Sequence, residues 1–198
     1  GLNARSYDVL TDTLTAWEAT AGEVPRRARL LCIWADAALA AGVENDPHNW
    51  FKSRNGDLDD FDYFPPSPDG LEAAAGNYAK AGQCPDIINT LIPYKDDVAI
   101  FGCDHTIYQL SGNPTSGGRF DSITDKVGIS FGMHTWCTDP EGNVYFWATT
   151  GGVYLLGHPC VNLSKRRLKR RFEQVNPATH KVQLAWNPDE EGVDVFIT

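Results

Sequence analysis

Short hydrophobic runs separated by acidic or glycine-rich turns recur along this chain and predict repeated groups of β-strands. The first group is expected at residues 29–34, 37–43 and 50–54, and the second at 89–94, 98–103 and 106–110. A third is expected at 132–137, 143–148 and 152–156, and a fourth begins at 182–186 and stops after 193–197. Corresponding strands lie roughly 45 to 60 residues apart, a period typical of β-propeller blades.

Strand repeats without alternating helices predict an all-β fold. One repeat is too small to bury its own faces, so neighbouring repeats must stack, and stacking around an axis gives a β-propeller. We therefore expect about three and a half propeller-like blades of antiparallel strands. Residues 1–28 are expected to be a strand and loop segment that closes a preceding blade. The partial β-propeller is expected over residues 29–198, with blades at about 29–63, 89–124, 132–163 and 182–198, the last incomplete.

Turn and breaker residues place the connections between these strands. Residues 35–41 are rich in alanine, which favours helix, but their place in the repeat predicts a strand. The proline-rich segment 64–70 cannot continue a strand, so residues 64–84 are expected to form a loop with at most a short helical turn at 71–75. Residues 121–124 should return as a short strand.

One short helix is predicted near the C-terminus, at residues 164–175. Ser164 is a plausible N-cap, and Leu168 and Phe172 lie four residues apart, so that both would pack on the neighbouring blade. Asn176 and Pro177 end the helix.

The charge of the chain is acidic overall and uneven along the sequence. The formal net charge is −9, which argues against general nucleic-acid binding. Six of the 17 Lys and Arg residues nevertheless lie in the segment 165–171. This segment is expected to be a solvated helix face, with contact to an acidic protein or to DNA as the alternative.

The sequence shows no membrane-spanning run and no hydrophobic signal-peptide core at its start. It lacks an initiator Met, and its last predicted strand has no partner after it. We therefore expect a segment of a longer protein. The five Cys residues are scattered and odd in number, which predicts reduced, mostly buried thiols instead of a disulfide framework.

The residues that could be catalytic are mostly expected in turns, where their polar side chains have a structural explanation. The run Gly102-Cys103-Asp104-His105 puts a thiol, a carboxylate and an imidazole side by side, but adjacent turn residues point in different directions. The carboxylate pairs Asp96–Asp97 and Glu190–Glu191 are expected in turns as solubilising charge.

Metal binding is also disfavoured. The acidic run Asp57, Asp59, Asp60 and Asp62 lacks the glycine and glutamate of a calcium loop, and is expected to end a blade edge with Phe61 and Tyr63 buried. Zinc spacing is absent from the five histidines, which are His48, His105, His134, His158 and His180. We expect no catalytic, cofactor-binding or metal-binding residues, no cofactor and no small-molecule substrate.

Three segments of the chain resemble parts of tailed-bacteriophage and prophage structural proteins. They are residues 46–63, beginning Asp-Pro-His-Asn-Trp-Phe; residues 91–114 with Gly117-Gly118; and residues 139–146 with 151–154. The resemblance runs from about Trp34 to the C-terminus and keeps order and spacing. It implies a β-propeller-type virion protein of the tail or head-to-tail region, and it brings no catalytic residues that can be placed on this sequence.

The expected function is therefore non-enzymatic: a structural component of a phage virion whose partners are other virion proteins or copies of itself. In a ring, its acidic surfaces would repel DNA phosphates, so that DNA makes only passing contact. One alternative is a cellular β-propeller that binds a glycan or a protein on its loop-rich face. Another is a propeller hydrolase or lyase with its site in a central channel.

Overall fold

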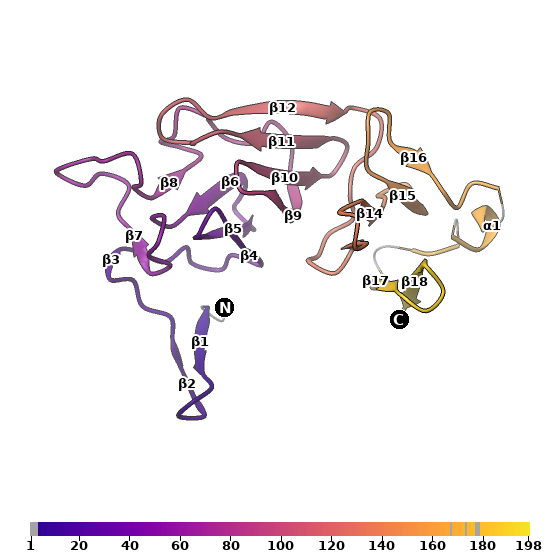
Figure 1. Ribbon diagram of the computed structural model, residues 1–198, viewed down its shortest axis with the longest axis horizontal. Helices are drawn as coiled ribbons and strands as arrows, with labels where there is room; N and C mark the ends of the chain where they lie inside the picture. The colour runs from indigo at the N-terminus through magenta and orange to yellow at the C-terminus, as the bar shows by residue number, and fades with distance from the viewer. Residues whose placement is uncertain (1–3, 167, 173, 177–178) are drawn as a thin grey trace.

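The computed structural model describes residues 4–166, 168–172, 174–176 and 179–198, and these residues form an all-β protein with one four-residue helix (Figure 1). Three four-stranded antiparallel sheets follow one another along the described chain. The first contains β4 (Leu30–Trp34), β5 (Ala37–Val43), β6 (Asp46–Lys52) and β8 (Ala74–Ala75). The second contains β9 (Ile88–Lys95), β10 (Val98–Cys103), β11 (Ile107–Ser111) and β12 (Arg119–Thr124). The third contains β13 (Trp136–Thr138), β14 (Val144–Trp147), β15 (Val153–Leu155) and β16 (Val161–Asn162).

Smaller elements flank this row of sheets. The antiparallel pairs are β1 (Arg5–Asp8) with β2 (Thr13–Ala16), and β17 (Val182–Asn187) with β18 (Gly192–Ile197). β3 (Ala21–Gly22) pairs in parallel with β7 (Asp60–Phe61), and helix α1 (Lys169–Phe172) lies between β16 and β17. The row is an open arch, with the β1–β2 hairpin below one end and β17–β18 below the other (Figure 1). Of the described residues, no helix is long and apolar enough to cross a membrane.

The all-β class is confirmed, and several predicted strands are found where the hydrophobic pattern places them. β5 and β10 have the predicted bounds, so the alanine-rich run is a strand although alanine favours helix. Its alanines are buried, and the strand lies between β4 and β6 in the first sheet. The predicted return strand at 121–124 is part of β12.

Three predictions about local structure are wrong in part. The helical turn expected at 71–75 is instead β8, whose Ala74 and Ala75 pair with Lys52 and Phe51 of β6. The strand expected from Gly132 begins only at Trp136, because the Thr135 hydroxyl donates hydrogen bonds to the carbonyl oxygens of Ser130 and Gly132 and holds a turn there.

The predicted helix at 164–175 is also longer than the observed α1. Residues 167 and 173 lie outside the described residues. α1 begins only at Lys169, and the Ser164 hydroxyl accepts a hydrogen bond from the Val153 backbone amide. Phe172 packs on Trp147 as predicted, with ring centroids 4.8 Å apart, whereas Leu168 is exposed.

Hydrophobic clusters lie between successive sheets and hold the row together. The first joins the first and second sheets around Trp50 and Phe101, and the second joins the second and third sheets around Ile100 and Phe146. The third joins the third sheet to β17 through Trp147 and Leu184. Adjacent residues alternate between clusters because side chains alternate along a strand, so both faces of the second and third sheets are buried.

A strained two-residue turn joins β4 to β5 and is supported by a neighbouring segment. Ala35 and Asp36 have φ angles of 51° and 56°, in the left-handed region that a type I′ hairpin turn requires. The Asn55 side-chain amide donates to the Ala35 carbonyl at 2.6 Å, and the Gly56 amide donates to the Asp36 carbonyl at 2.8 Å. These bonds hold two non-glycine residues in a conformation that they rarely adopt.

Candidate interaction surfaces

The first sheet leaves one side of β4 uncovered. Leu30 and Trp34 point into the cluster shared with the second sheet, whereas Leu31 and Ile33 point the opposite way and are 48% and 54% exposed. Leu31 and Ile33 lie opposite Ala40 and Ala38 of β5. Two branched aliphatic side chains are therefore presented to solvent next to small residues; we call this surface the β4 face.

The last sheet of the row has an uncovered side as well. Leu184 of β17 is buried against the third sheet, while its neighbour Gln183 points outward opposite Phe196 of β18. Phe196 is 52% exposed, and Ala185 and Asp194 form the next pair on the same side. We call this surface the β18 face.

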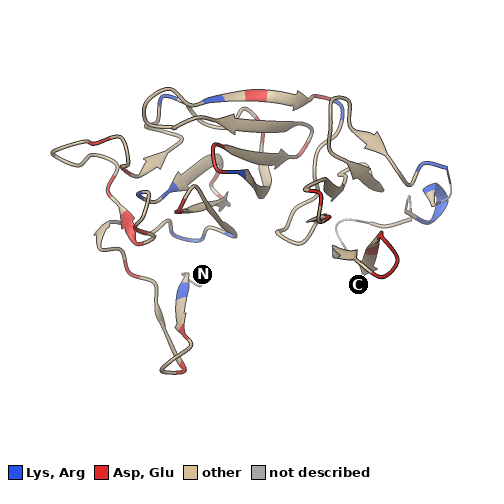
Figure 2. Ribbon diagram, viewed as in Figure 1, with Lys and Arg blue, Asp and Glu red and all other residues tan. Residues whose placement is uncertain are grey.

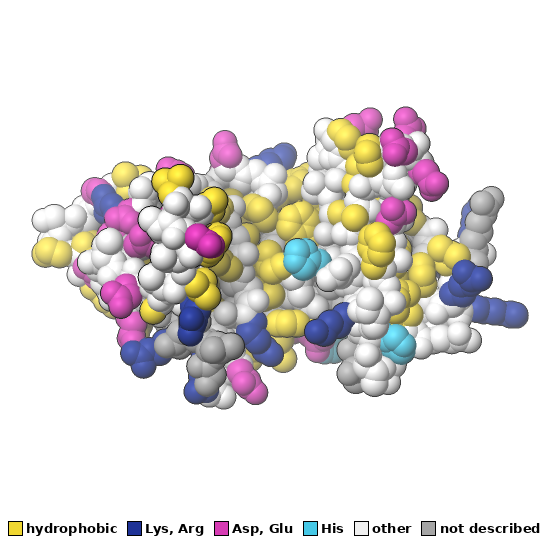
Figure 3. Space-filling model, turned by 90° about the horizontal axis from the view of Figure 1, so that it is seen from below, with side chains coloured by type: hydrophobic (Ala, Val, Ile, Leu, Met, Phe, Trp, Pro, Cys, Tyr) yellow, Lys and Arg dark blue, Asp and Glu magenta, His cyan; other side chains and the backbone are white. Residues whose placement is uncertain are grey.

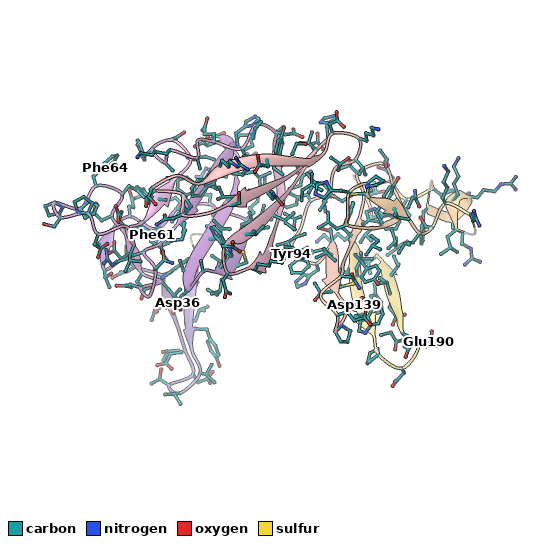
Figure 4. The ribbon with its side chains drawn as sticks, turned by 45° about the horizontal axis from the view of Figure 1, so that its top comes forward. Asp36, Phe61, Phe64, Tyr94, Asp139 and Glu190 are labelled. Carbon is teal, nitrogen blue, oxygen red and sulfur yellow. The ribbon has the colours of Figure 1, made fainter. Side chains whose placement is uncertain are left out.

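Charges of opposite sign accompany the two faces. The segment that leads into β4 carries Arg26 and Arg27, and the turn between β17 and β18 carries Asp189, Glu190 and Glu191 (Figure 2). Glu190 and Asp139 lie on neighbouring turns at the same end of the molecule (Figure 4). Between these turns is a cavity of about 410 Å³, and beside it Tyr145 stacks on Trp186. The predicted position of Glu190–Glu191 in a turn is confirmed.

The β1–β2 hairpin is exposed along its whole length. Tyr7, Val9 and Leu14 are more than half exposed, and Leu10 at its tip is 96% exposed. The hairpin is attached to the body through Trp17, whose indole nitrogen donates to an Asp59 carboxylate oxygen at 2.5 Å. It therefore forms an arm with apolar side chains that contact no core.

A groove lies between the second sheet, the third sheet and β17. Its volume is about 660 Å³, and the residues lining it include Asp104, Phe131, His134, His180 and Lys181. Seen from below, hydrophobic side chains gather across the middle of the molecule, with a histidine among them (Figure 3). The groove combines an exposed aromatic ring with polar groups of both charges, a composition suited to ligand binding.

In the run 102–105, Gly102 and Cys103 end β10, and Asp104 and His105 form the turn between β10 and β11, as predicted. The Cys103 thiol is buried, whereas the His105 side chain is 81% exposed, so the two groups point away from each other. The Asp86 carboxylate holds the turn by accepting hydrogen bonds from the His105 and Thr106 amides. Partial burial alone would raise the pKa of Asp86, but these hydrogen bonds keep it below its usual value. This geometry assembles no thiol–imidazole pair at the turn.

The acidic run 57–62 has a local structural role. Asp57, Asp60 and Asp62 each accept a hydrogen bond from the backbone amide two residues later, and Phe61 is buried as predicted. Tyr63 is only partly buried. Among the described residues no group of three His, Cys, Asp or Glu is arranged to hold a metal ion.

The remaining candidate residues are dispersed over the molecule. The His48 ring contacts the Cys84 carbonyl oxygen at 3.1 Å, and His158 lies in the loop between β15 and β16. Asp96 and Asp97 form the turn between β9 and β10, as expected. In the basic segment Arg167 lies outside the described residues, and Lys165, Arg166, Arg170 and Arg171 are exposed.

Sequence reasoning missed a buried lysine in the first sheet. Lys52 of β6 is buried, and its ammonium group donates to the Ser53 carbonyl and, at 2.5 Å, to the Asn55 side-chain oxygen. Burial lowers the pKa of Lys52 to about 8, although the charge of Glu72 acts in the opposite direction. Asn55 thus connects Lys52 to the strained turn at Ala35. Because side chains alternate along a strand, residue 52 lies on the same side of β6 as the buried Trp50. This alternation is the sequence signal that could have identified Lys52 as buried.

Compared with known proteins, the chain matches no family model and no curated sequence.

Proposed function

We propose that this chain is a non-enzymatic structural component of a phage virion, at the tail or the head-to-tail junction, and that its sheets are successive blades of a β-propeller. The resemblance of residues 46–63 and 91–114 to phage structural proteins supports the virion assignment. Antiparallel sheets in chain order, each sharing a core with the next, support the propeller.

The uncovered faces at the two ends of the row carry the structural proposal. Sheets inside the row are covered on both sides, whereas the β4 face and the β18 face expose Ile33 and Phe196. Exposed branched and aromatic side chains on adjoining strands are typical of a surface that another protein covers.

The occupant that fits both faces is a second copy of this chain. The β18 face of one copy would pack on the β4 face of the next, and the acidic turn at 189–191 would approach Arg27. Arg26 beside it already forms an ion pair with Glu23. Opposite charges favour this head-to-tail arrangement over like faces meeting. A head-to-tail contact that repeats and closes generates a ring, which would complete a propeller that one row of sheets leaves open.

Incorporation into particles tests the virion assignment directly. A tagged copy of the gene would be expressed during phage production, and particles would be purified and examined by mass spectrometry. We expect the tagged chain in the particles, and Ile33→Asp should abolish its incorporation while Val161→Asp, at an exposed site on β16, should not. Absence of the wild-type chain from purified particles would refute the assignment.

A binding module for a glycan or a protein is the second candidate function, and the groove beside Phe131 and His134 favours it. Glycan-array binding that is lost in Phe131→Ala, with the same melting temperature, would support this candidate over the structural one. The third candidate is a hydrolase or lyase, and the double variant Asp104→Ala with His105→Ala tests it. Turnover by the wild type that is lost in this variant would contradict a structural role.

A further inference from the structure

The thiols of Cys84 and Cys103 lie next to each other in the core between the first and second sheets. Their sulfur atoms are 3.4 Å apart, and both residues are buried. A disulfide bond requires about 2.05 Å between the sulfurs. The two sulfurs therefore need to approach each other by little more than an ångström.

The two backbones are held in place by different sheets. The Cys84 amide donates to the His48 carbonyl of β6 at 3.0 Å. Cys103 ends β10, where its amide donates to the Thr106 carbonyl at 2.9 Å. A bond between the sulfurs would therefore join the loop that carries Cys84, which is hydrogen-bonded to the first sheet, covalently to the end of β10 in the second sheet.

Both cysteines are buried in the folded protein, so a peroxide would reach the pair when the loop that carries Cys84 opens. Cys84 lies in the irregular loop between β8 and β9, between the exposed residues Gln83 and Pro85. Such a loop opens locally at lower cost than a core strand. Cys103, at the end of a core strand, is then the second thiol that reacts with the oxidised Cys84.

We infer that Cys84 and Cys103 form an intramolecular disulfide when the protein meets a peroxide. The Cys84 sulfur attacks hydrogen peroxide, the O–O bond breaks, and a sulfenic acid and water are formed. The Cys103 sulfur then attacks the sulfenic sulfur, the S–O bond breaks, and the second water leaves. The two thiols lose two electrons and two protons to one peroxide, so the reaction is balanced.

Reaction is expected to be slow at neutral pH. The hydrogen bond with the Cys84 thiol and burial raise the pKa of the Cys103 thiol well above its ordinary value, and only the thiolate attacks readily. The rate of cross-linking should therefore rise with pH. The resulting bond closes the loop 84–103 and should raise the melting temperature by roughly 5 to 10 °C.

Peptide mapping of the whole chain tests this inference. Trypsin cleaves after Lys80, Lys95 and Arg119, so the disulfide would join peptide 81–95 to peptide 96–119. After peroxide treatment and alkylation we expect this linked pair, released by a reductant. Cys84→Ala should abolish it, whereas Cys160→Ser should leave it unchanged. The map of the wild-type chain tests the inference without any variant. If both thiols are still alkylated after oxidation, or if either is linked to another cysteine, the inference is overturned.

Discussion

The second sheet and β17–β18 are built from the same kind of strands but differ in what covers them. Ile92 and Ile100 of the second sheet face one cluster while Leu91 and Phe101 face another, so both sides are buried. In β17–β18 only the side carrying Leu184 is buried, and Phe196 on the other side meets solvent. The difference shows that a strand pattern sets which residues share a face, while neighbouring sheets decide whether that face is covered.

The largest expected change in the free energy of unfolding comes from truncating Phe101 in the second sheet, both sides of which are buried. Phe101 is fully buried and its ring lies 5.0 Å from that of Phe120 and 6.4 Å from that of Trp50. Phe101→Ala should lower the free energy of unfolding by about 3–5 kcal/mol, measured by urea denaturation. Leu31→Ala on the open β4 face is the control, and an equal loss there would contradict the difference between covered and open faces.

Part of this organisation could be predicted from sequence. The bounds of β10 follow from a hydrophobic run between two polar turns, and the all-β class follows from the repeats. β8 could not be predicted, because two alanines after a proline-rich segment carry no strand signal and become a strand only by pairing with β6.

The candidate surfaces were less predictable than the strands. The alternation Leu30, Leu31, Cys32, Ile33 shows that two faces exist, but exposure of one depends on which sheet stacks beside it. The proximity of Cys84 to Cys103 depends in the same way on how the loop before β9 returns to the end of β10. Long-range packing of this kind has no signature in a short segment of sequence.

The buried Lys52 should make the stability of the first sheet depend on pH. Its folded pKa of about 8 lies below the ordinary value of 10.5, so the unfolded state binds the proton more tightly. Below the folded pKa the charged side chain costs stability, and stability should rise between about pH 8 and pH 10 by up to about 3 kcal/mol. Urea denaturation of wild type and Lys52→Met at several pH values isolates this contribution, and identical pH dependence in both would contradict it.

The junction between the second and third sheets should be sensitive to a single methyl group. A Cβ atom at Gly128 would lie 2.2 Å from the backbone oxygens of both Cys103 and Asp104. Gly128→Ala should therefore lower the free energy of unfolding by roughly 1–3 kcal/mol. Gly142→Ala is the control, because no atom lies within 4 Å of the added Cβ and only the positive φ of Gly142 disfavours alanine there. A loss at Gly128 no larger than that at Gly142 would show that the two sheets are less closely packed than described.

The open faces should matter least for stability and most for association. Ile33→Asp changes a half-exposed side chain, so the free energy of unfolding should change by only about 0.5 kcal/mol. The same change would place a carboxylate in the proposed contact between copies, where burying an unpaired charge is costly.

Sedimentation velocity over a range of concentrations measures this association most directly. For wild type we expect a species larger than one chain whose fraction rises with concentration. Ile33→Asp and Phe196→Asp should each convert it to the monomer, and Val161→Asp should leave it intact. A wild-type chain that remains monomeric at every concentration, or an assembly that both face variants leave unchanged, would contradict the assignment of the β4 and β18 faces as contacts between copies.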